Sequence, residues 1–354
     1  MRSSLKIFAR SAGLATRLLK KSASKNLGVY WLSTSANDGK KMSSSLAGDD
    51  LRSVNVTINV NSQKVTLDAI VQDTMPSGSS VGTVVAVHGV PGSHKDFKYL
   101  LPPLKDAGIR LIGVNFPGFN YTLDSPDLQH TNHERSDYVQ AIVDQLGLSR
   151  KLVFMGHSRG SENAIRLAVR NPKDCVGVML VNPLGLRPNR GMRPLSAVNS
   201  VTFLWNLGPI TQFFLRPFLL WLYNSVLKFP VSTGDQAALC FRLGTNANLR
   251  SQLPIIKKLN ERRDVAVVVA YSGSDRLVET EVSRELADAF ETGPEIVCRA
   301  DDHKASNASQ ELHTLFRNGH TKVAVRFDKE NHFLQKHRAV FIVDAIRSML
   351  ARSQ

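Results

Sequence analysis

Six short apolar runs alternate with helical segments along the chain, and this alternation constrains the fold more than any other feature. The runs are TVVAVHG (83–89), RLIGVNF (110–116), KLVFMG (151–156), VGVMLVN (176–182), VAVVVAYSG (265–273) and KVAVRFD (322–328). Valine-rich runs of this length are typical of strands that are buried on both faces of a sheet. We therefore expect an α/β fold, with a mainly parallel twisted sheet and helices on both faces.

The segments around these runs complete the predicted core. Helices are expected at 137–146, 161–169, 282–290 and 339–350. Before the first run, residues 54–60 and 65–71 alternate apolar and polar side chains around a short polar turn, which predicts an antiparallel hairpin. The core is expected in two parts, an N-terminal part at 38–182 and a C-terminal part at 259–354.

The alternation stops at residues 183–258, which we expect to form a helical cap inserted after the sixth strand. Within it, residues 194–227 hold a single charge, Arg216, and seven aromatic side chains. Apolar side chains point in every direction on a helical wheel, which indicates burial on all sides or contact with lipid. Two interpretations stay open, a cap packed over the core and a cap that also touches a membrane surface. Repeated proline and polar residues argue against a spanning helix.

The basic charge of the chain is concentrated at its beginning. Of the formal net charge of +15, seven units lie in residues 1–37, which contain no Asp or Glu, so +8 remains for the rest. No basic block is interleaved with aromatic residues, so nucleic acid is not an expected partner. Residues 1–21 place cations opposite apolar side chains on a helical wheel, which is typical of a mitochondrial transit peptide. We expect a mitochondrial protein; a membrane-surface helix and a disordered tail are the alternatives.

The sharpest motif is Gly156-His157-Ser158-Arg159-Gly160, between an apolar run and a predicted helix. A GxSxG sequence in that context is typical of a nucleophile elbow, a sharp turn that exposes the serine hydroxyl. The two glycines lack a Cβ, which lets the strand and the helix approach each other. We therefore expect Ser158 to be a nucleophile. The alternative is a Gly/Ser turn that only caps the helix.

A second motif, His88-Gly89-Val90-Pro91-Gly92, directly follows the first apolar run. A loop of this kind at a strand end can direct backbone N–H groups at a developing oxyanion. The expected pair of donors is the N–H of Val90 and the N–H of Arg159, the residue after the nucleophile. The Arg159 side chain has two interpretations, contact with an anionic group of a substrate and a salt bridge directed away from it.

A serine nucleophile needs a base, and the base needs a group that orients it. Of the ten histidines, His332 is favoured because it stands between the last apolar run and the last predicted helix. Asp275 is the favoured acid because it follows the fifth run, and sites gather at the carboxyl ends of parallel strands. Asp301 and Asp302 are alternative acids, since the interval between Asp275 and His332 is long and its extra residues lie at about 291–319.

The motifs HGVPG, FPGF, GHSRG, SGSD and NHF together resemble the α/β-hydrolase superfamily over about residues 54–350. The form HGxPG is similar to the epoxide hydrolase and dehalogenase branch. That branch uses an aspartate nucleophile where this chain has Ser158, so its chemistry is not carried over. The longer segments VHGVPGSHKDFKYL, FPGFNYT and QHTNHERSDYV resemble a nematode family of α/β-hydrolase-like proteins. The order Ser158, Asp275, His332 matches that of the superfamily.

Together these features predict a serine hydrolase that cleaves an ester, thioester or amide of an apolar acyl substrate through an acyl-enzyme. The expected partner is a small-molecule or lipid acyl substrate, and the reaction requires no cofactor and no metal. Two alternatives stay open. One is a non-catalytic protein of this fold that binds a lipid or a partner through its cap. The other is a membrane-associated lipid hydrolase or acyltransferase whose cap lies on the bilayer. No oligomeric state is predicted.

Overall fold

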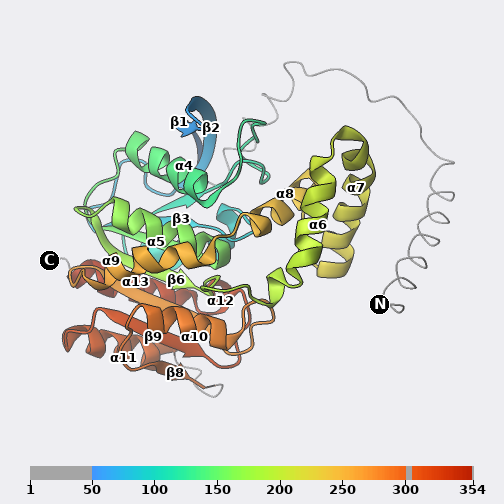
Figure 1. The fold of residues 1–354 in the computed structure, drawn as a ribbon. Helices are drawn as coiled ribbons and strands as arrows, with labels where there is room; N and C mark the ends of the chain where they lie inside the picture. The colour runs from blue at the N-terminus through green and yellow to red at the C-terminus, as the bar shows by residue number, and fades with distance from the viewer. Residues whose placement is uncertain (1–49, 300–304, 353–354) are drawn as a thin grey trace. The chain divides into compact units, whose positions relative to one another are not determined.

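A nine-stranded sheet forms the centre of the computed structural model, which describes residues 50–299 and 305–352 (Figure 1). The strands are β1 Leu51–Val60, β2 Gln63–Asp73, β3 Thr83–Val87, β4 Arg110–Val114, β5 Leu152–His157, β6 Cys175–Val181, β7 Ala266–Ser272, β8 Ile296–Cys298 and β9 Lys322–Phe327. Their order in the sheet is β1-β2-β4-β3-β5-β6-β7-β9-β8. The pairings of β1 with β2 and of β2 with β4 are antiparallel, and the others are parallel. The expected α/β fold is confirmed.

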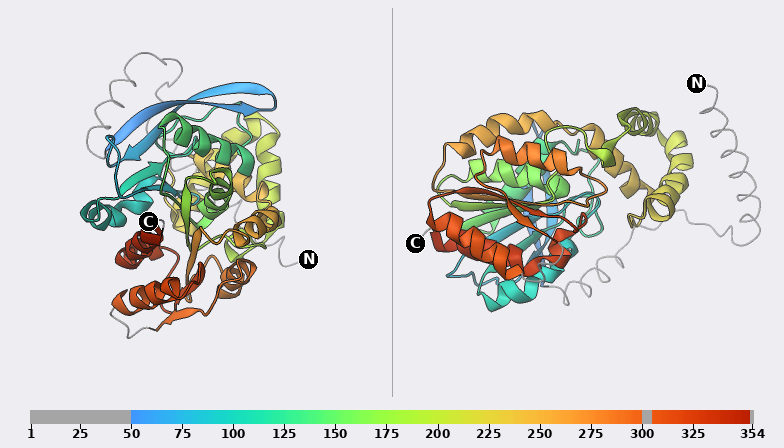
Figure 2. Two further views of the ribbon diagram at one scale, coloured as in Figure 1. Left: turned by 90° about the vertical axis from the view of Figure 1, so that its left-hand side faces the viewer. Right: turned by 90° about the horizontal axis from the view of Figure 1, so that it is seen from below.

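The six apolar runs are the strands β3 to β7 and β9, and their side chains alternate between two cores. Val85 belongs to the core on one face of the sheet and Val84 to the core on the other. Figure 2 shows helices on both faces of the sheet. The first core is covered by α4 Asn132–Gln145, α5 Ser161–Arg170, α9 Leu253–Asn260 and α10 Thr280–Ala289. The second is covered by α3 Leu101–Asp106, α11 Ala305–Arg317, α12 Leu334–His337 and α13 Ala339–Arg352.

The predicted hairpin is formed by β1 and β2, and its turn is shorter than expected. Val60 pairs with Gln63, so only Asn61 and Ser62 lie between the strands. Both have positive φ, at 48° and 68°. Two consecutive positive φ values are the geometry of the tight hairpin turn that matches strand twist.

The extra residues at 291–319 contribute a strand and a helix at the far edge of the sheet. The short strand β8 pairs with β9 in parallel, and α11 follows it. Asp301 and Asp302, the alternative acids, lie outside the described residues, as does the predicted transit peptide at 1–37.

Three helices between β6 and β7 stand to one side of the sheet in Figure 1: α6 Leu195–Asn206, α7 Pro209–Trp221 and α8 Gly234–Thr245. The π-helical turn η5, Leu222–Leu227, follows α7. Helix α8 buries much of its length, whereas α6 buries no residue and α7 buries only Leu219. Among the described residues, no helix has both the length and the hydropathy to cross a bilayer.

Candidate active site

Ser158 occupies a strained turn between β5 and α5, where its φ is +49°. Such a φ costs a residue with a Cβ about 1–2 kcal/mol, so it is kept only where the surroundings enforce it. A Cβ on Gly160 would lie 2.1 Å from the carbonyl oxygen of Val87, and one on Gly156 would lie 2.6 Å from the carbonyl oxygen of Gly160. Only glycine fits at these two positions. The turn has the geometry of a nucleophile elbow, and the Ser158 side chain is partly exposed.

Asp275 and His332 are joined by a hydrogen bond of 2.7 Å from His332 Nδ1 to Asp275 Oδ2. The second carboxylate oxygen, Oδ1, accepts the backbone N–H groups of Leu277 at 2.8 Å and Val278 at 3.1 Å. Burial alone would raise the pKa of Asp275, but the hydrogen bond from His332 and these N–H groups lower it overall. Burial lowers the pKa of His332, and Asp275 offsets this only in part. The pair therefore holds an ionised Asp275 and a neutral His332 at pH 7.

The backbone that carries His332 is fixed by three polar side chains from neighbouring strand ends. Asn182 Nδ2 donates to the carbonyl oxygens of His332 at 2.8 Å and of Asn331 at 3.0 Å. His157 Nε2 lies 3.0 Å from the carbonyl oxygen of His332, and Ser272 Oγ donates to that of Asn331 at 2.7 Å. The sequence analysis missed these supporting residues. Their only signal was position, since each stands at or just after the carboxyl end of a parallel strand.

His332 stands beside the elbow, because its ring centroid lies 5.0 Å from that of His157, the residue before Ser158. Its Nδ1 is bound to Asp275, which leaves Nε2 as the nitrogen that can accept a proton. Among the described residues no hydrogen bond joins the Ser158 hydroxyl to this ring. Catalytic hydrogen bonds are often long without substrate and tighten when it binds.

The loop that carries Val90 is tied by His88 to the segment that follows β4. His88 Nδ1 lies 2.6 Å from the carbonyl oxygen of Gly89, and its Nε2 accepts the N–H of Phe116 at 3.3 Å. Burial lowers the pKa of His88 to about 4, so the ring is neutral and keeps this one tautomer. A Cβ on Gly89 would lie only 3.2 Å from the Cβ of Ser158. The two motifs identified in the sequence are therefore in contact.

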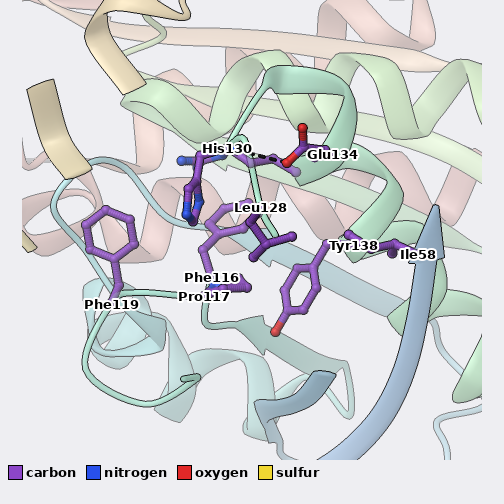
Figure 3. Close-up of a pocket in the computed structure, with 9 residues that line it drawn as sticks. Ile58, Phe116, Pro117, Phe119, Leu128, His130, Glu134 and Tyr138 are labelled. Atoms are coloured by element: carbon purple, nitrogen blue, oxygen red, sulfur yellow. Dashed lines mark hydrogen bonds between the residues drawn. The ribbon is translucent and has the colours of Figure 1, made fainter. Parts of the chain in front are cut away.

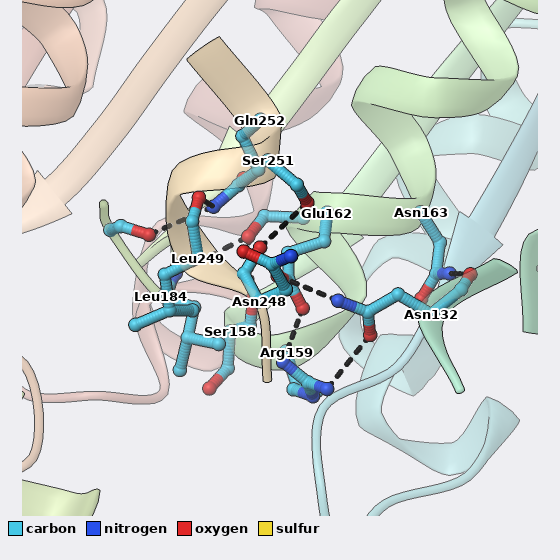
Figure 4. Close-up of polar contacts among 12 residues, drawn as sticks. Asn132, Ser158, Arg159, Glu162, Asn163, Leu184, Asn248, Leu249, Ser251 and Gln252 are labelled. Atoms are coloured by element: carbon cyan, nitrogen blue, oxygen red, sulfur yellow. Dashed lines mark hydrogen bonds and ion pairs between the residues drawn. The ribbon is translucent and has the colours of Figure 1, made fainter. Parts of the chain in front are cut away.

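Arg159 turns its side chain away from Ser158, as Figure 4 shows. Its guanidinium pairs with Glu162 and donates to Asn132 Oδ1 at 2.7 Å. Asn132 Nδ2 in turn donates to Glu162 Oε1 at 2.9 Å. Of the two interpretations of this side chain, the structure shows the salt bridge. The chain is thereby anchored at the residue whose backbone N–H is the expected oxyanion donor.

A second buried cation, Arg135, lies behind this network. Its guanidinium stacks 3.7 Å from the ring centroid of Phe116, and among the described residues its three nitrogens have no hydrogen-bond partner. Burial and the charge of Arg159 lower its pKa to about 9. Figure 3 shows the cavity beside it, which has a volume of about 10 Å³ and room for one water at most. This cavity is too small for a substrate.

A larger cavity of about 350 Å³ lies over Ser158, within the size range of small-ligand sites. Val90 and Arg159 line it beside Ser158, so both expected oxyanion donors belong to residues at the site. Its other wall comes from the helices between β6 and β7, with Tyr223 and Phe241 among the lining side chains. Among residues 50–299 and 305–352, no group of His, Cys, Asp and Glu side chains is placed to hold a metal ion.

Comparisons with known proteins agree with this architecture. Residues 50–351 match the family described as alpha/beta hydrolase of unknown function (DUF1057). The chain is 30% identical to the uncharacterized protein F35H12.5 of Caenorhabditis elegans over 312 residues, which are 85% of this chain and 87% of that protein. It is similar to the haloalkane dehalogenase DatA from Agrobacterium tumefaciens C58, with a TM-score of 0.57 and 16% identity over 87% of this chain and 98% of that one. It is also similar to a thermophilic esterase from Thermogutta terrifontis, with a TM-score of 0.56 and 18% identity over 85% and 99%.

The two solved structures share the fold at identities too low to transfer an activity, whereas the family match spans nearly all the described residues. The resemblance inferred from HGVPG and GHSRG is confirmed: the chain belongs to the alpha/beta hydrolase family DUF1057.

Proposed function

We propose that the chain is a serine hydrolase that cleaves an ester, thioester or amide of an apolar acyl substrate through an acyl-enzyme. The observation that carries the proposal is the position of Ser158, at φ +49° on a turn enforced by glycines and facing the cavity. The hydrogen-bonded Asp275 and His332 beside it supply the base and its orienting group.

In this mechanism the Ser158 Oγ attacks the acyl carbonyl carbon while His332 Nε2 takes its proton. The electron pair of the carbonyl bond moves to the oxygen, which the N–H groups of Val90 and Arg159 stabilise. Collapse of this intermediate breaks the bond to the alcohol, thiol or amine, which leaves with the proton from His332. Water then attacks the acyl-enzyme, gives its proton to His332 and releases the acid, and the proton returns to Ser158.

The fixed charges around the site suit these reaction steps. Asp275 stabilises the imidazolium that forms twice in each turnover. The anchored Arg159 keeps its backbone N–H from reorienting, and losing one oxyanion donor typically lowers the rate about 10²–10³-fold. The side chains of Tyr223 and Phe241 favour an apolar acyl group in the cavity.

Labelling with a fluorophosphonate probe tests the proposal, because the probe reacts with activated serines only. We expect wild type and Ser200→Ala to be labelled and Ser158→Ala to be unlabelled, with all three folded by circular dichroism. Ser200 lies on the exposed surface of α6 and serves as the control. A folded wild-type protein that takes no label would overturn the enzyme proposal and favour the non-catalytic binding protein.

The surface of α6 and α7 favours a second candidate, a hydrolase or acyltransferase that works on a lipid surface. Ile210 is 77% exposed, and Phe213 and Phe214 are each 69% exposed. The sequence has no Asp or Glu between Asp174 and Asp235, so this face presents no negative charge of its own. Aromatic and aliphatic side chains on helices without acids suit the interface of an anionic bilayer.

Co-sedimentation with vesicles of phosphatidylcholine and phosphatidylserine tests this second candidate. We expect wild type to sediment with the vesicles and the triple variant Ile210→Ser, Phe213→Ser, Phe214→Ser to stay in solution. Leu123→Ser is the matched control, since Leu123 is 74% exposed outside these helices. Equal sedimentation of the triple variant and wild type would contradict the candidate. If wild type is instead a dimer that does not bind vesicles, and the triple variant is a monomer, the face would be assigned to contact with a second copy of the chain.

We also propose that residues 1–37 direct the chain to mitochondria, on the strength of their cations and the absence of acids. A fluorescent protein fused behind residues 1–37 is expected to enter mitochondria. The substitutions Arg10→Glu and Arg17→Glu should abolish this import by interrupting the cationic side of the predicted helix. A fusion that stays in the cytosol would contradict the proposal.

A further inference from the structure

The cavity over Ser158 is apolar along one part of its wall and cationic along another. Arg190, Arg193 and Arg276 line it, and no Asp or Glu is among the described residues that do so. All three arginines are exposed, which places them on the solvent side of the cavity. Tyr223 and Phe241 line the covered part. The cavity therefore offers separate surroundings to an apolar group and to an anionic one.

One acidic residue next to these arginines compensates one of their charges. Glu279 pairs with the guanidinium of Arg193 and accepts the backbone N–H of Arg190 at 2.8 Å. Among the described residues, the guanidinium groups of Arg190 and Arg276 form neither an ion pair nor a hydrogen bond. Two charges of the same sign remain at the edge of a cleft, where field lines concentrate and attract an anion.

We propose that the substrate is an acyl ester or thioester whose leaving group bears phosphate. This inference rests on the proposed function. With the carbonyl at Ser158, the acyl chain occupies the apolar part of the cavity, and the leaving group extends to Arg190 and Arg276. Two unpaired guanidinium groups suit the several oxygens and multiple charge of phosphate, which arginine binds in bidentate fashion. A lysophospholipid and an acyl-coenzyme A thioester share this chemistry.

Two matched substrate pairs test the inference. The first pair, 1-lauroyl lysophosphatidate and 1-lauroylglycerol, differs by one phosphate group. The second pair is lauroyl-coenzyme A and S-lauroyl-N-acetylcysteamine, whose thiol lacks the phosphate-bearing part of coenzyme A. We expect kcat/KM to be about tenfold higher for the phosphate-bearing member of at least one pair. The pair that shows the difference identifies the source of the phosphate.

The double variant Arg190→Gln, Arg276→Gln should lose that advantage, so that the ratio of kcat/KM between the phosphate-bearing and the neutral member of the pair falls about tenfold. Arg347→Gln removes an exposed arginine on α13, away from the cavity, and should behave as wild type. Raising the salt concentration should weaken the preference of wild type and leave the double variant unchanged.

A binding measurement separates this inference from the proposed function. Dodecyl phosphate should bind the Ser158→Ala protein more tightly than dodecanol does, and the added substitution of Arg190 and Arg276 should remove the difference. Equal hydrolysis of both members of each pair, unaffected by the arginine substitutions, would overturn the inference while the hydrolase stands. Selective binding of dodecyl phosphate by a protein that hydrolyses neither pair would overturn the hydrolase while the anion site stands.

Discussion

The Nδ1 atom of His332 lies 2.7 Å from Oδ2 of Asp275, although the two residues are 57 positions apart in the sequence. The contact follows from the strand order, because β7 and β9 are direct neighbours and their carboxyl ends meet at one edge of the sheet. The intervening strand β8 pairs on the outer side of β9. The long interval is therefore accommodated at the sheet edge and does not separate the acid from the base.

Replacing Asp275 with Asn should lower kcat about 10⁴-fold, because an amide in place of the carboxylate favours the wrong tautomer of His332. Steady-state kinetics on a short acyl ester would measure the loss, with circular dichroism to show that the fold is kept. Asp344→Asn, a change on the distant helix α13, should keep wild-type activity. A loss of less than tenfold in Asp275→Asn would point to another acid.

The strands were predictable from the sequence because each parallel strand is buried on both faces and must be apolar throughout. Asp275 and His332 were chosen as candidate acid and base because they follow such strands. Helix α4 was expected at 137–146 and begins at Asn132, because Thr131 caps it and accepts the N–H of Glu134. That cap is polar and precedes the apolar pattern, so hydrophobic periodicity does not register it.

Other features depend on contacts that no local pattern contains. Glu162 is one turn from Arg159 in sequence, yet Asn132 completes the network from a different helix. The apolar residues of α6 and α7 gave no sign of how far they are exposed, because composition is the same for a buried helix and for one that meets lipid. Supporting residues such as Asn182 show their role only in three dimensions.

The pH dependence of the reaction should reflect the lowered pKa of His332. The base must be neutral, so kcat/KM rises as pH increases through the pKa of the free enzyme. Because burial lowers that pKa, the midpoint should fall below the ordinary value of 6.5. Rates between pH 4 and 9 on an uncharged ester would measure it. A midpoint above 6.5 would mean that the ring is more hydrated, or more strongly paired with Asp275, than this geometry implies.

His88 should make the folded state sensitive to mild acid. Its pKa is about 4 in the folded state and about 6.5 in the unfolded state, so above pH 6.5 neither state binds the proton. Between pH 6.5 and 4 the unfolded state binds a proton that the folded state excludes, so the free energy of unfolding decreases as the pH is lowered. The full effect is about 3 kcal/mol, of which about 2 kcal/mol is lost by pH 5.

Urea unfolding at pH 7 and pH 5 would test this linkage. His88→Asn should lose about 2 kcal/mol less than wild type between these pH values, whatever its stability at pH 7. His313→Gln, at an exposed histidine, should show the wild-type difference. Identical pH dependence in wild type and His88→Asn would contradict the assignment of a neutral, buried ring to His88.

Two glycine substitutions should separate steric from torsional strain at the elbow. Gly160 has a φ of −68°, which alanine tolerates, but a Cβ there would lie 2.1 Å from the Val87 carbonyl oxygen. Gly147 has a φ of +59° in open space. We expect Gly147→Ala to cost about 1–2 kcal/mol with full activity, and Gly160→Ala to displace Ser158 and abolish fluorophosphonate labelling. Normal labelling of Gly160→Ala would show that β3 and the elbow can move apart without consequence.

The charges buried behind the elbow are unbalanced, since Arg135 and Arg159 share the one carboxylate of Glu162. Replacing Glu162 with Gln leaves two cations without a counter-charge and should destabilise the protein by about 3–5 kcal/mol. Glu311→Gln, at an exposed glutamate, should change stability by less than about 0.5 kcal/mol.

Removing the second cation, Arg135, should recover part of the stability that Glu162→Gln loses. Because the Arg135 nitrogens lack hydrogen-bond partners among the described residues, Arg135→Met alone should be close to neutral or stabilising. In the double variant with Glu162→Gln, the methionine should recover part of the lost free energy, since one uncompensated charge then replaces two. Urea unfolding of the four proteins in a double-mutant cycle measures the coupling. Strictly additive effects would mean that Arg135 does not sense Glu162, and that water reaches its guanidinium through the small cavity beside Phe116.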